Sequence, residues 1–355
     1  MTTIDKSTPV LVTGATGYVA GWLVKKLLEE GLTVHAAVRN PENKSKLAHL
    51  DELAANATGN IKYFKADLLK IGSYADAMEG CELVYHTASP YTLDVKDPQK
   101  ELIDPALNGT RNVLNQASKT ASVKRVVVTS SCAAIYSDAI DCETAPNGIL
   151  TEEVWNTTSS LSYLPYSYSK TLAEQEAWKI SKSQKQWDLV VVNPCGVFGP
   201  ALNPTTSTSE STSIMKQIGD GTMKAGVPKL GFGVVDVRDL ADAHFEAGFR
   251  PEANGRNIIL GHNTNLLEMA LTLQVEFGSK FPLPKSALPK WLLMIVGPFA
   301  NKAFTRKFIR NNVNQEWRGD NSKSVRELGM NYRSLKETMV DDFRSLVNAN
   351  IIQSK

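Results

Sequence analysis

The chain has few cysteines and few histidines, and neither type is spaced as a bound metal requires. The cysteines show no paired spacing, so we expect free thiols and no disulfide framework. The histidines include no closely spaced ligand pair, so no catalytic metal is expected. The residues concerned are Cys81, Cys132, Cys142 and Cys195, and His35, His49, His86, His244 and His262.

Long apolar runs and an excess of one charge are also missing. The longest apolar run, Trp291 to Val296, is far shorter than the roughly 20 residues that a membrane-spanning helix needs. The first residues contain no apolar signal core. The formal net charge is +2, with Lys and Arg spread along the chain, so neither nucleic acid nor a membrane is expected as a partner. These features favour a cytoplasmic globular protein.

Strand-like and helix-like segments alternate over the first two thirds of the chain, which predicts a parallel sheet covered on both faces. The strand candidates are Val10 to Thr13, Thr33 to Val38, Ile61 to Lys65, Leu83 to Thr87, Arg125 to Ser130 and Leu189 to Asn193. The later segments Asp239 to Phe249, Leu266 to Phe277 and Leu335 to Asn348 have helical patterns, and Val234 to Asp236 is strand-like. The predicted class is α/β: a Rossmann-type doubly wound parallel sheet with a smaller, mostly helical C-terminal lobe.

We expect a dinucleotide-binding domain over residues 1–195, completed by about 231–260. Residues 196–230 and 261–355 would then form a substrate-binding lobe. Residues 203–213 are rich in Ser, Thr and Pro, which is typical of an exposed loop. Our hypothesis is that this loop is a mobile flap over the substrate.

A glycine-rich turn joins the first strand to an amphipathic helix that ends at Gly31. Its spacing, Gly14-x-x-Gly17-x-x-Ala20, places a small residue where a third glycine is usual. Glycines let the backbone approach a pyrophosphate, whose charge the free amides of the helix start stabilise. The turn therefore predicts a dinucleotide site.

Tyr166 and Lys170 stand four residues apart, which places them on one face if the segment through Ile180 is helical. A free phenol has a pKa of about 10, and a neighbouring ammonium lowers it. We therefore expect Lys170 to make Tyr166 a usable acid. A pair of serines, Ser130 and Ser131, ends an earlier strand and offers hydroxyl donors to a developing oxyanion.

The end of the second strand carries Arg39 instead of the acid that grips an NAD ribose. Lys44 and Lys46 follow within reach of the same phosphate. Cations at this point favour a coenzyme with a 2′-phosphate, so NADP(H) is predicted.

These motifs together resemble the extended short-chain dehydrogenase/reductase family, within the NAD-dependent epimerase/dehydratase superfamily. The resemblance runs from about residue 9 to about residue 345. Four segments resemble the dihydroflavonol 4-reductase and cinnamoyl-CoA reductase branch of this family. They are Ala37-Val-Arg39-Asn-Pro, His86-Thr-Ala-Ser-Pro90, Ser167-Tyr-Ser-Lys-Thr-Leu-Ala-Glu174 and Asn193-Pro194 with Val-Phe-Gly-Pro200. The same branch also holds microbial NADPH-dependent aldehyde and ketone reductases.

The resemblance implies an NADPH-dependent carbonyl reductase in which hydride reaches an aldehyde or ketone carbon and Tyr166 protonates its oxygen. It assigns Ser131, the second serine, as the catalytic one, with Ser130 as the fallback. Lys170 would also bind the nicotinamide ribose, and Tyr168 lacks a lysine partner. The implied coenzyme-binding residues are Gly14, Thr16, Gly17, Tyr18, Val19, Arg39, Lys46, Asp67, Leu68, Thr87, Ala88, Ser89, Tyr166, Lys170, Pro194 and Val197; Asp67 is equally compatible with a helix cap.

Tyr136 stands where plant dihydroflavonol reductases carry a polar group, so a broader aldehyde or ketone substrate is expected. The aromatic residues Tyr91, Tyr136, Tyr163 and Phe198 indicate an apolar or aromatic substrate, or else pack the core. A nucleotide-sugar epimerase or dehydratase and a hydroxysteroid dehydrogenase remain alternatives, as does a non-catalytic NADP-binding sensor. We expect a monomer or a homodimer.

Overall fold

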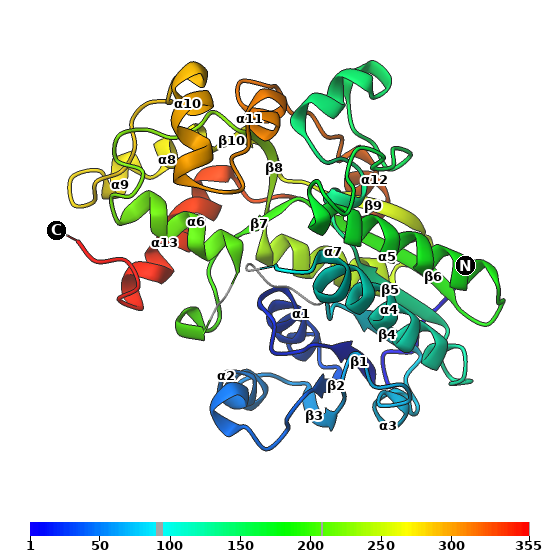
Figure 1. Ribbon diagram of the computed structural model, residues 1–355. Coiled ribbons are helices and arrows are strands. Elements are labelled where there is room, and N and C mark those ends of the chain that lie inside the picture. Colours follow the sequence, from blue (N-terminus) through cyan, green and yellow to red (C-terminus); the bar gives the residue numbers. More distant parts are fainter. Residues whose placement is uncertain (90–94, 207–208, 355) are drawn as a thin grey trace.

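The computed structural model describes residues 1–89, 95–206 and 209–354. Within these residues, a seven-stranded parallel sheet runs through the larger part of the molecule in the order β3-β2-β1-β4-β5-β6-β9 (Figure 1). Its strands are β1 (Val10–Thr13), β2 (Thr33–Val38), β3 (Asn60–Lys65), β4 (Leu83–His86), β5 (Arg125–Thr129), β6 (Asp188–Pro194) and β9 (Gly255–Ile259). The predicted fold class is confirmed.

Successive strand residues point to opposite sides of the sheet, so both faces of the sheet are apolar. Helices cover each of these faces. Val10 and Val12 face a core with Leu23 of α1 and Leu240 of α7, whereas Leu11 faces a second core with α4 and α5. The helices around this sheet are α1 (Tyr18–Glu29), α2 (Lys44–Ala55), α3 (Ala75–Met78), α4 (Asp104–Ala117), α5 (Pro165–Lys182), α7 (Val237–Phe249) and α12 (Ser322–Leu328).

A three-stranded sheet of order β10-β8-β7 belongs to the smaller part, where β8 pairs antiparallel with β10 and parallel with β7. Its strands are β7 (Gly196–Phe198), β8 (Gly231–Asp236) and β10 (His262–Asn265), and its helices are α6 (Glu210–Gly219), α8 (Leu266–Thr272), α9 (Gln274–Phe277), α10 (Lys290–Ala300), α11 (Arg306–Asn312) and α13 (Leu335–Asn348). Short helical turns lie at Gln99–Ile103, Cys132–Ala134, Ala139–Thr144, Pro146–Gly148 and Pro204–Thr206.

Two predicted segments differ from the structure. The helical pattern Leu266 to Phe277 forms two helices, α8 and α9, that meet at Leu273. The predicted loop over residues 203–213 is partly helical, because the Ser209 side chain accepts from the Thr212 amide and caps α6. Residues 207–208 of that loop lie outside the described residues, as does Tyr91.

The order of the strands reverses direction at β1, which lies between β2 and β4. Chain connections leave such a switch point on opposite sides of the sheet and open a crevice at the carboxyl ends of the strands. The glycine turn after β1 and the segment after β4 both begin at this point. The fold therefore brings the predicted coenzyme residues to one edge of the sheet.

Candidate active site

The turn after β1 has the backbone that a bound diphosphate requires. Gly14 has φ +65°, and a Cβ there would lie 3.1 Å from the Cα of Ala88, so both conformation and space demand glycine. Gly17 is the residue before α1, and no side chain among the described residues caps that helix start. Thr16 and Gly17 are exposed. The first-turn amides of α1 are thus open to an anion, which fits a dinucleotide.

The residues after Gly17 bind this turn to its surroundings. The hydroxyl of Tyr18 donates to the carbonyl oxygen of Gly199 at 2.7 Å, which connects α1 to the segment after β7. Val19 packs against the core between the sheet and α1. Their side chains therefore hold the turn in place, and their backbone amides belong to the first turn of α1.

Thr13 fixes the segment after β4 beside the glycine turn. Its hydroxyl oxygen accepts from the amides of Thr87 at 3.1 Å and Ala88 at 3.0 Å, and the Thr87 hydroxyl donates to the Thr13 carbonyl. Ser89 follows as an exposed residue. Sequence reasoning missed the role of Thr13, although a hydroxyl at the end of a buried strand is a usable signal.

Arg39 lies directly after β2 and is exposed, and Lys46 is an exposed residue of the first turn of α2. Asp67 and Leu68 follow β3 after one residue. The Asp67 carboxylate accepts from the Leu69 amide at 2.9 Å, so it closes a local turn and does not cap a helix. Leu68 packs against Gly109 of α4. All four residues lie at the carboxyl edge of the sheet.

The helix α5 carries Tyr166 and Lys170 one turn apart near its start. Pro165 occupies its first position, which its fixed φ suits. Leu164, just before it, has φ 51° and ψ 57°, a left-handed conformation that costs a non-glycine residue roughly 1–3 kcal/mol. This strained residue sets the angle at which the chain enters α5, and so the position of Tyr166.

The two serines after β5 have different partners. The side chain of Ser131 lies near enough to Tyr166 to lower the pKa of its phenol, and the Ser131 hydroxyl oxygen accepts from the Ala133 amide at 3.1 Å. Ser130 is buried, and its hydroxyl donates to the carboxylate of Glu174 at 2.5 Å. The structure therefore places Ser131, and not Ser130, beside the phenol.

The prediction that Lys170 lowers the pKa of Tyr166 is wrong for this structure. Burial and the carboxylate of Glu210 raise the pKa of Tyr166 to about 12, and the nearby Ser131 side chain opposes them. With a pKa of about 12 the hydroxyl is protonated at neutral pH, and the residue as a whole is 37% exposed. Lys170 is itself buried, and burial lowers its pKa to about 8 against the opposing effect of Glu174.

Glu174 is a buried hub that sequence reasoning missed. Its carboxylate accepts from Asn193 Nδ2 at 2.7 Å and from Arg256 Nε at 2.6 Å, in addition to the Ser130 hydroxyl. Asn193 also donates to the Ser131 carbonyl at 3.2 Å. The hub thereby joins β6, β9 and α5 to both serines. An acid one turn after Lys170 is the signal that could have found it.

Four further predicted residues lie in β6, in β7 and in the segment after β5. Pro194 is the buried last residue of β6, and Val197 is half-buried in β7. Phe198 is 2% exposed and belongs to the core of the smaller part, and Tyr136 packs on Trp317 with ring centroids 5.3 Å apart. These two aromatic residues therefore pack the interior.

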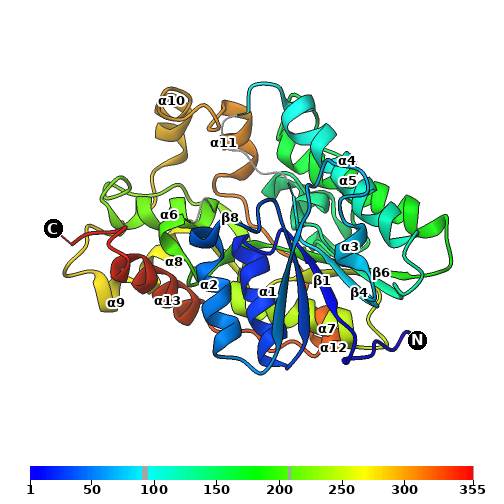
Figure 2. The same cartoon turned by 90° about the horizontal axis from the view of Figure 1, so that it is seen from below.

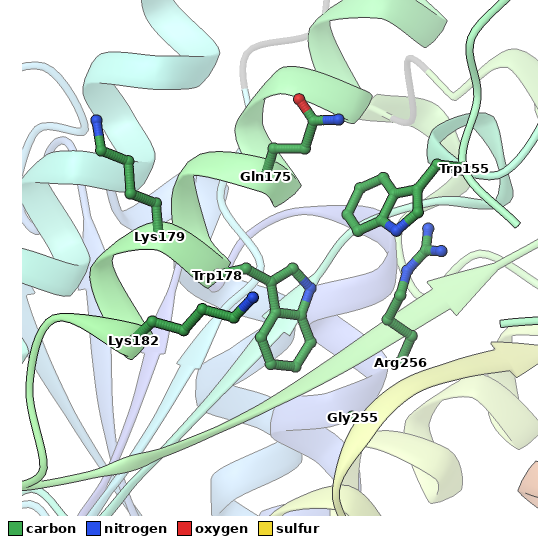
Figure 3. Close-up of a pocket in the computed structure, with 7 residues that line it drawn as sticks. All are labelled: Trp155, Gln175, Trp178, Lys179, Lys182, Gly255 and Arg256. Atoms are coloured by element: carbon green, nitrogen blue, oxygen red, sulfur yellow. The ribbon is translucent and has the colours of Figure 1, made fainter. Parts of the chain in front are cut away.

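A surface pocket of about 530 Å³ lies next to the C-terminal half of α5. Figure 3 shows its lining residues, with the Arg256 guanidinium against the Trp155 ring at 3.9 Å. The guanidinium also donates to the carbonyls of Glu152 and Val154. The residues that line this pocket do not include Ser131, Tyr166 or Lys170, although Arg256 also donates to Glu174.

The parallel sheet, the glycine turn and the Ser131, Tyr166 and Lys170 group define an oxidoreductase of the short-chain dehydrogenase/reductase type. The model of the NAD dependent epimerase/dehydratase family matches residues 10–261, and the chain belongs to this family.

Known relatives are reductases. Cinnamoyl-CoA reductase CAD2 of Medicago truncatula is 42% identical over 273 residues, covering 76% of this chain and 81% of that protein. Tetraketide alpha-pyrone reductase 1 of Arabidopsis thaliana is 34% identical and covers 97% of both chains. The structure of Gre2 from Candida albicans in complex with NADPH has a TM-score of 0.77 and 29% identity, covering 96% of this chain and 99% of that chain. The predicted family and enzyme class are confirmed, and the NADPH complex agrees with the predicted coenzyme.

Proposed function

We propose that the protein is an NADP(H)-dependent carbonyl reductase that acts on apolar or aromatic aldehydes and ketones. The observation that carries the proposal is the position of the Ser131 side chain beside Tyr166, with Lys170 one turn further along α5. A hydroxyl donor, a protonated phenol and a lysine in one place are what protonation of a carbonyl oxygen requires. The names of the relatives, among them cinnamoyl-CoA reductase and tetraketide alpha-pyrone reductase, support the reaction class.

The residues present fit the coenzyme. The open amides after Gly17 would hold the diphosphate, because Gly14 leaves no Cβ between the turn and Ala88. Arg39 and Lys46 would meet the 2′-phosphate, as two exposed cations near the ends of neighbouring elements. The coenzyme, when bound, supplies the hydride.

The chain's own residues handle the substrate oxygen. Ser131 donates to that oxygen and so stabilises the negative charge that develops on it. Tyr166 gives up its proton to the same oxygen, and its raised pKa keeps that proton in place until charge develops. Lys170, one turn further along α5, would bind the ribose of the nicotinamide. We further propose that residues 196–230 and 261–355 shape the substrate pocket.

The alternatives fit the site less well. Related dehydratases place an Asp-Glu pair just after the serine region, where this chain has Cys132 and Ala133. Arg39 disfavours an epimerase that retains NAD, because a cation there has no 2′-phosphate to bind. A non-catalytic sensor has no need of the complete Ser131, Tyr166 and Lys170 group.

The test is a panel of aldehydes, ketones and ketosteroids assayed for oxidation of NADPH and, separately, of NADH, together with nucleotide sugars assayed for an epimerised or dehydrated product. We expect turnover of aromatic or apolar carbonyls, with NADPH preferred. Binding of NADPH without turnover of any carbonyl would support the sensor. Reduction restricted to ketosteroids would support a hydroxysteroid dehydrogenase, and conversion of a nucleotide sugar would support an epimerase or dehydratase.

A further inference from the structure

The helices α10 and α11 form a hairpin at the periphery of the smaller part. They share a small core of Leu293, Ile309 and Val313, which is separate from the main core of that part. Lys290 at the start of α10 donates to the carbonyl of Arg310 in α11 at 2.9 Å. Figures 1 and 2 both show the hairpin at the edge of the molecule. One face of α10 therefore has no packing partner within the described residues.

That face is apolar. Phe299 is 87% exposed, Trp291 66%, Ile295 57% and Val296 44%. Trp291, Ile295 and Phe299 follow one another at four-residue intervals, so they lie along one side of the helix. We call these four residues the α10 face. Of the exposed large apolar residues in the described part of the chain, a third lie on this one helix, and single exposed apolar residues elsewhere need no explanation.

The segment that contains the hairpin carries charge of one sign. Between Glu276 and Glu316 the sequence has seven basic residues and no Asp or Glu. The basic residues are Lys280, Lys285, Lys290, Lys302, Arg306, Lys307 and Arg310. Lys302 and Arg306 are exposed just beyond Phe299. A whole-chain charge of +2 conceals this local excess, which is why the sequence analysis expected no membrane partner.

An apolar helix face with basic neighbours and aromatic residues at both ends is the composition that binds the interface of an anionic bilayer. Among the described residues no helix is long and apolar enough to cross a membrane, and α10, with 11 residues, would lie in the interfacial plane. The acyl chains of a bilayer can take up the exposed apolar residues of the α10 face, and its anionic headgroups can pair with the basic residues that follow. We propose that the α10 face docks the protein on anionic lipid bilayers, with Trp291 and Phe299 inserted and Lys302 and Arg306 against the headgroups.

The test is sedimentation of the full chain with phosphatidylcholine vesicles, with and without an equal part of phosphatidylserine. We expect binding to the anionic vesicles that falls with added salt. Trp291→Ala combined with Phe299→Ala should weaken binding about tenfold or more, because the inserted apolar area is lost. Lys302→Glu combined with Arg306→Glu should weaken it similarly and only for anionic vesicles.

Matched control variants distinguish binding through the α10 face from non-specific adsorption to vesicles. Val275→Ala removes an 86% exposed apolar residue from α9, and Lys119→Glu with Lys185→Glu reverses two exposed charges after α4 and α5. Both controls should bind like the wild type. No binding to anionic vesicles, or equal losses in the controls, would overturn the proposal. So would a dimer that the Trp291 and Phe299 variant abolishes, since a second copy would then cover the face.

Discussion

Replacing Glu174 by glutamine removes a buried negative charge at nearly constant volume. Glu174 is 1% exposed and its partner Arg256 is 7% exposed, so water cannot replace the lost partner of the guanidinium. Removing one member of a buried ion pair typically costs about 3–5 kcal/mol. Glutamine keeps one acceptor oxygen, which can serve Arg256 or Asn193 but leaves an NH₂ facing the other donor. We expect the free energy of unfolding to fall by about 3 kcal/mol.

Urea unfolding followed by circular dichroism measures this change. Glu316→Gln is the matched control, because Glu316 pairs with Arg318 at 2.8 Å while their side chains are 72% and 55% exposed. Exposed pairs contribute roughly 0–1 kcal/mol, so the control should unfold almost like the wild type. If the free energy of unfolding falls no more in Glu174→Gln than in Glu316→Gln, Glu174 does not stabilise the fold as a buried hub.

The same substitution should move the pH profile of turnover. Glu174 raises the pKa of Lys170, which burial lowers to about 8, and the charge of Lys170 in turn lowers the pKa of His86. Without the carboxylate the lysine loses its proton at lower pH. The high-pH limb of kcat should therefore shift to lower pH in Glu174→Gln, and an unchanged limb would show that Lys170 does not sense the hub.

Three further substitutions test the site. Arg39→Ala should weaken NADPH binding about tenfold or more and leave NADH binding unchanged in titrations, since hydrogen bonds to a charged group contribute about 1.5–3 kcal/mol; equal losses for both coenzymes would make Arg39 a bystander. Ser131→Ala should lower kcat per folded enzyme more than Ser130→Ala, and the reverse order in steady-state kinetics would exchange their roles. In the folded wild type Lys170 loses its proton near pH 8, whereas the unfolded lysine keeps it to about pH 10.5. The unfolded state therefore binds more protons between these values, and the free energy of unfolding rises with pH there. Urea unfolding should show a smaller rise in Lys170→Met.

Local patterns in the sequence predicted much of the fold. The helix over residues 335–348 has the predicted bounds, because its apolar spacing and the Ser334 cap are both local features. The first two strands likewise match, since each is a short apolar run between turn residues. The strands β9 and β10 were not predicted. In the case of β9 the reason is its pairing with β6, more than 60 residues earlier, which leaves no local pattern in the sequence.

The candidate site, like the fold, was predicted only where its signal is local in the sequence. The sequence placed Tyr166 and Lys170 on one helix face from their spacing alone. It could not find the contact between Glu174 and Arg256, which are 82 residues apart. It also gave the wrong direction for the pKa of Tyr166, because burial and the nearness of Glu210 depend on the tertiary fold. Electrostatics of this kind follows from packing and not from spacing.

The most direct test of the proposed function compares Tyr166→Phe with Tyr168→Phe in an assay that follows NADPH oxidation and alcohol formation with an aromatic aldehyde. Tyr168 is the matched control, a tyrosine of the same helix without a lysine one turn later. We predict that Tyr166→Phe binds NADPH like the wild type and loses about a hundredfold or more in kcat, since general acid catalysis contributes roughly 10²–10⁴. Tyr168→Phe should retain most of its turnover. Near-normal turnover in Tyr166→Phe, with the loss in Tyr168→Phe instead, would contradict the proposal.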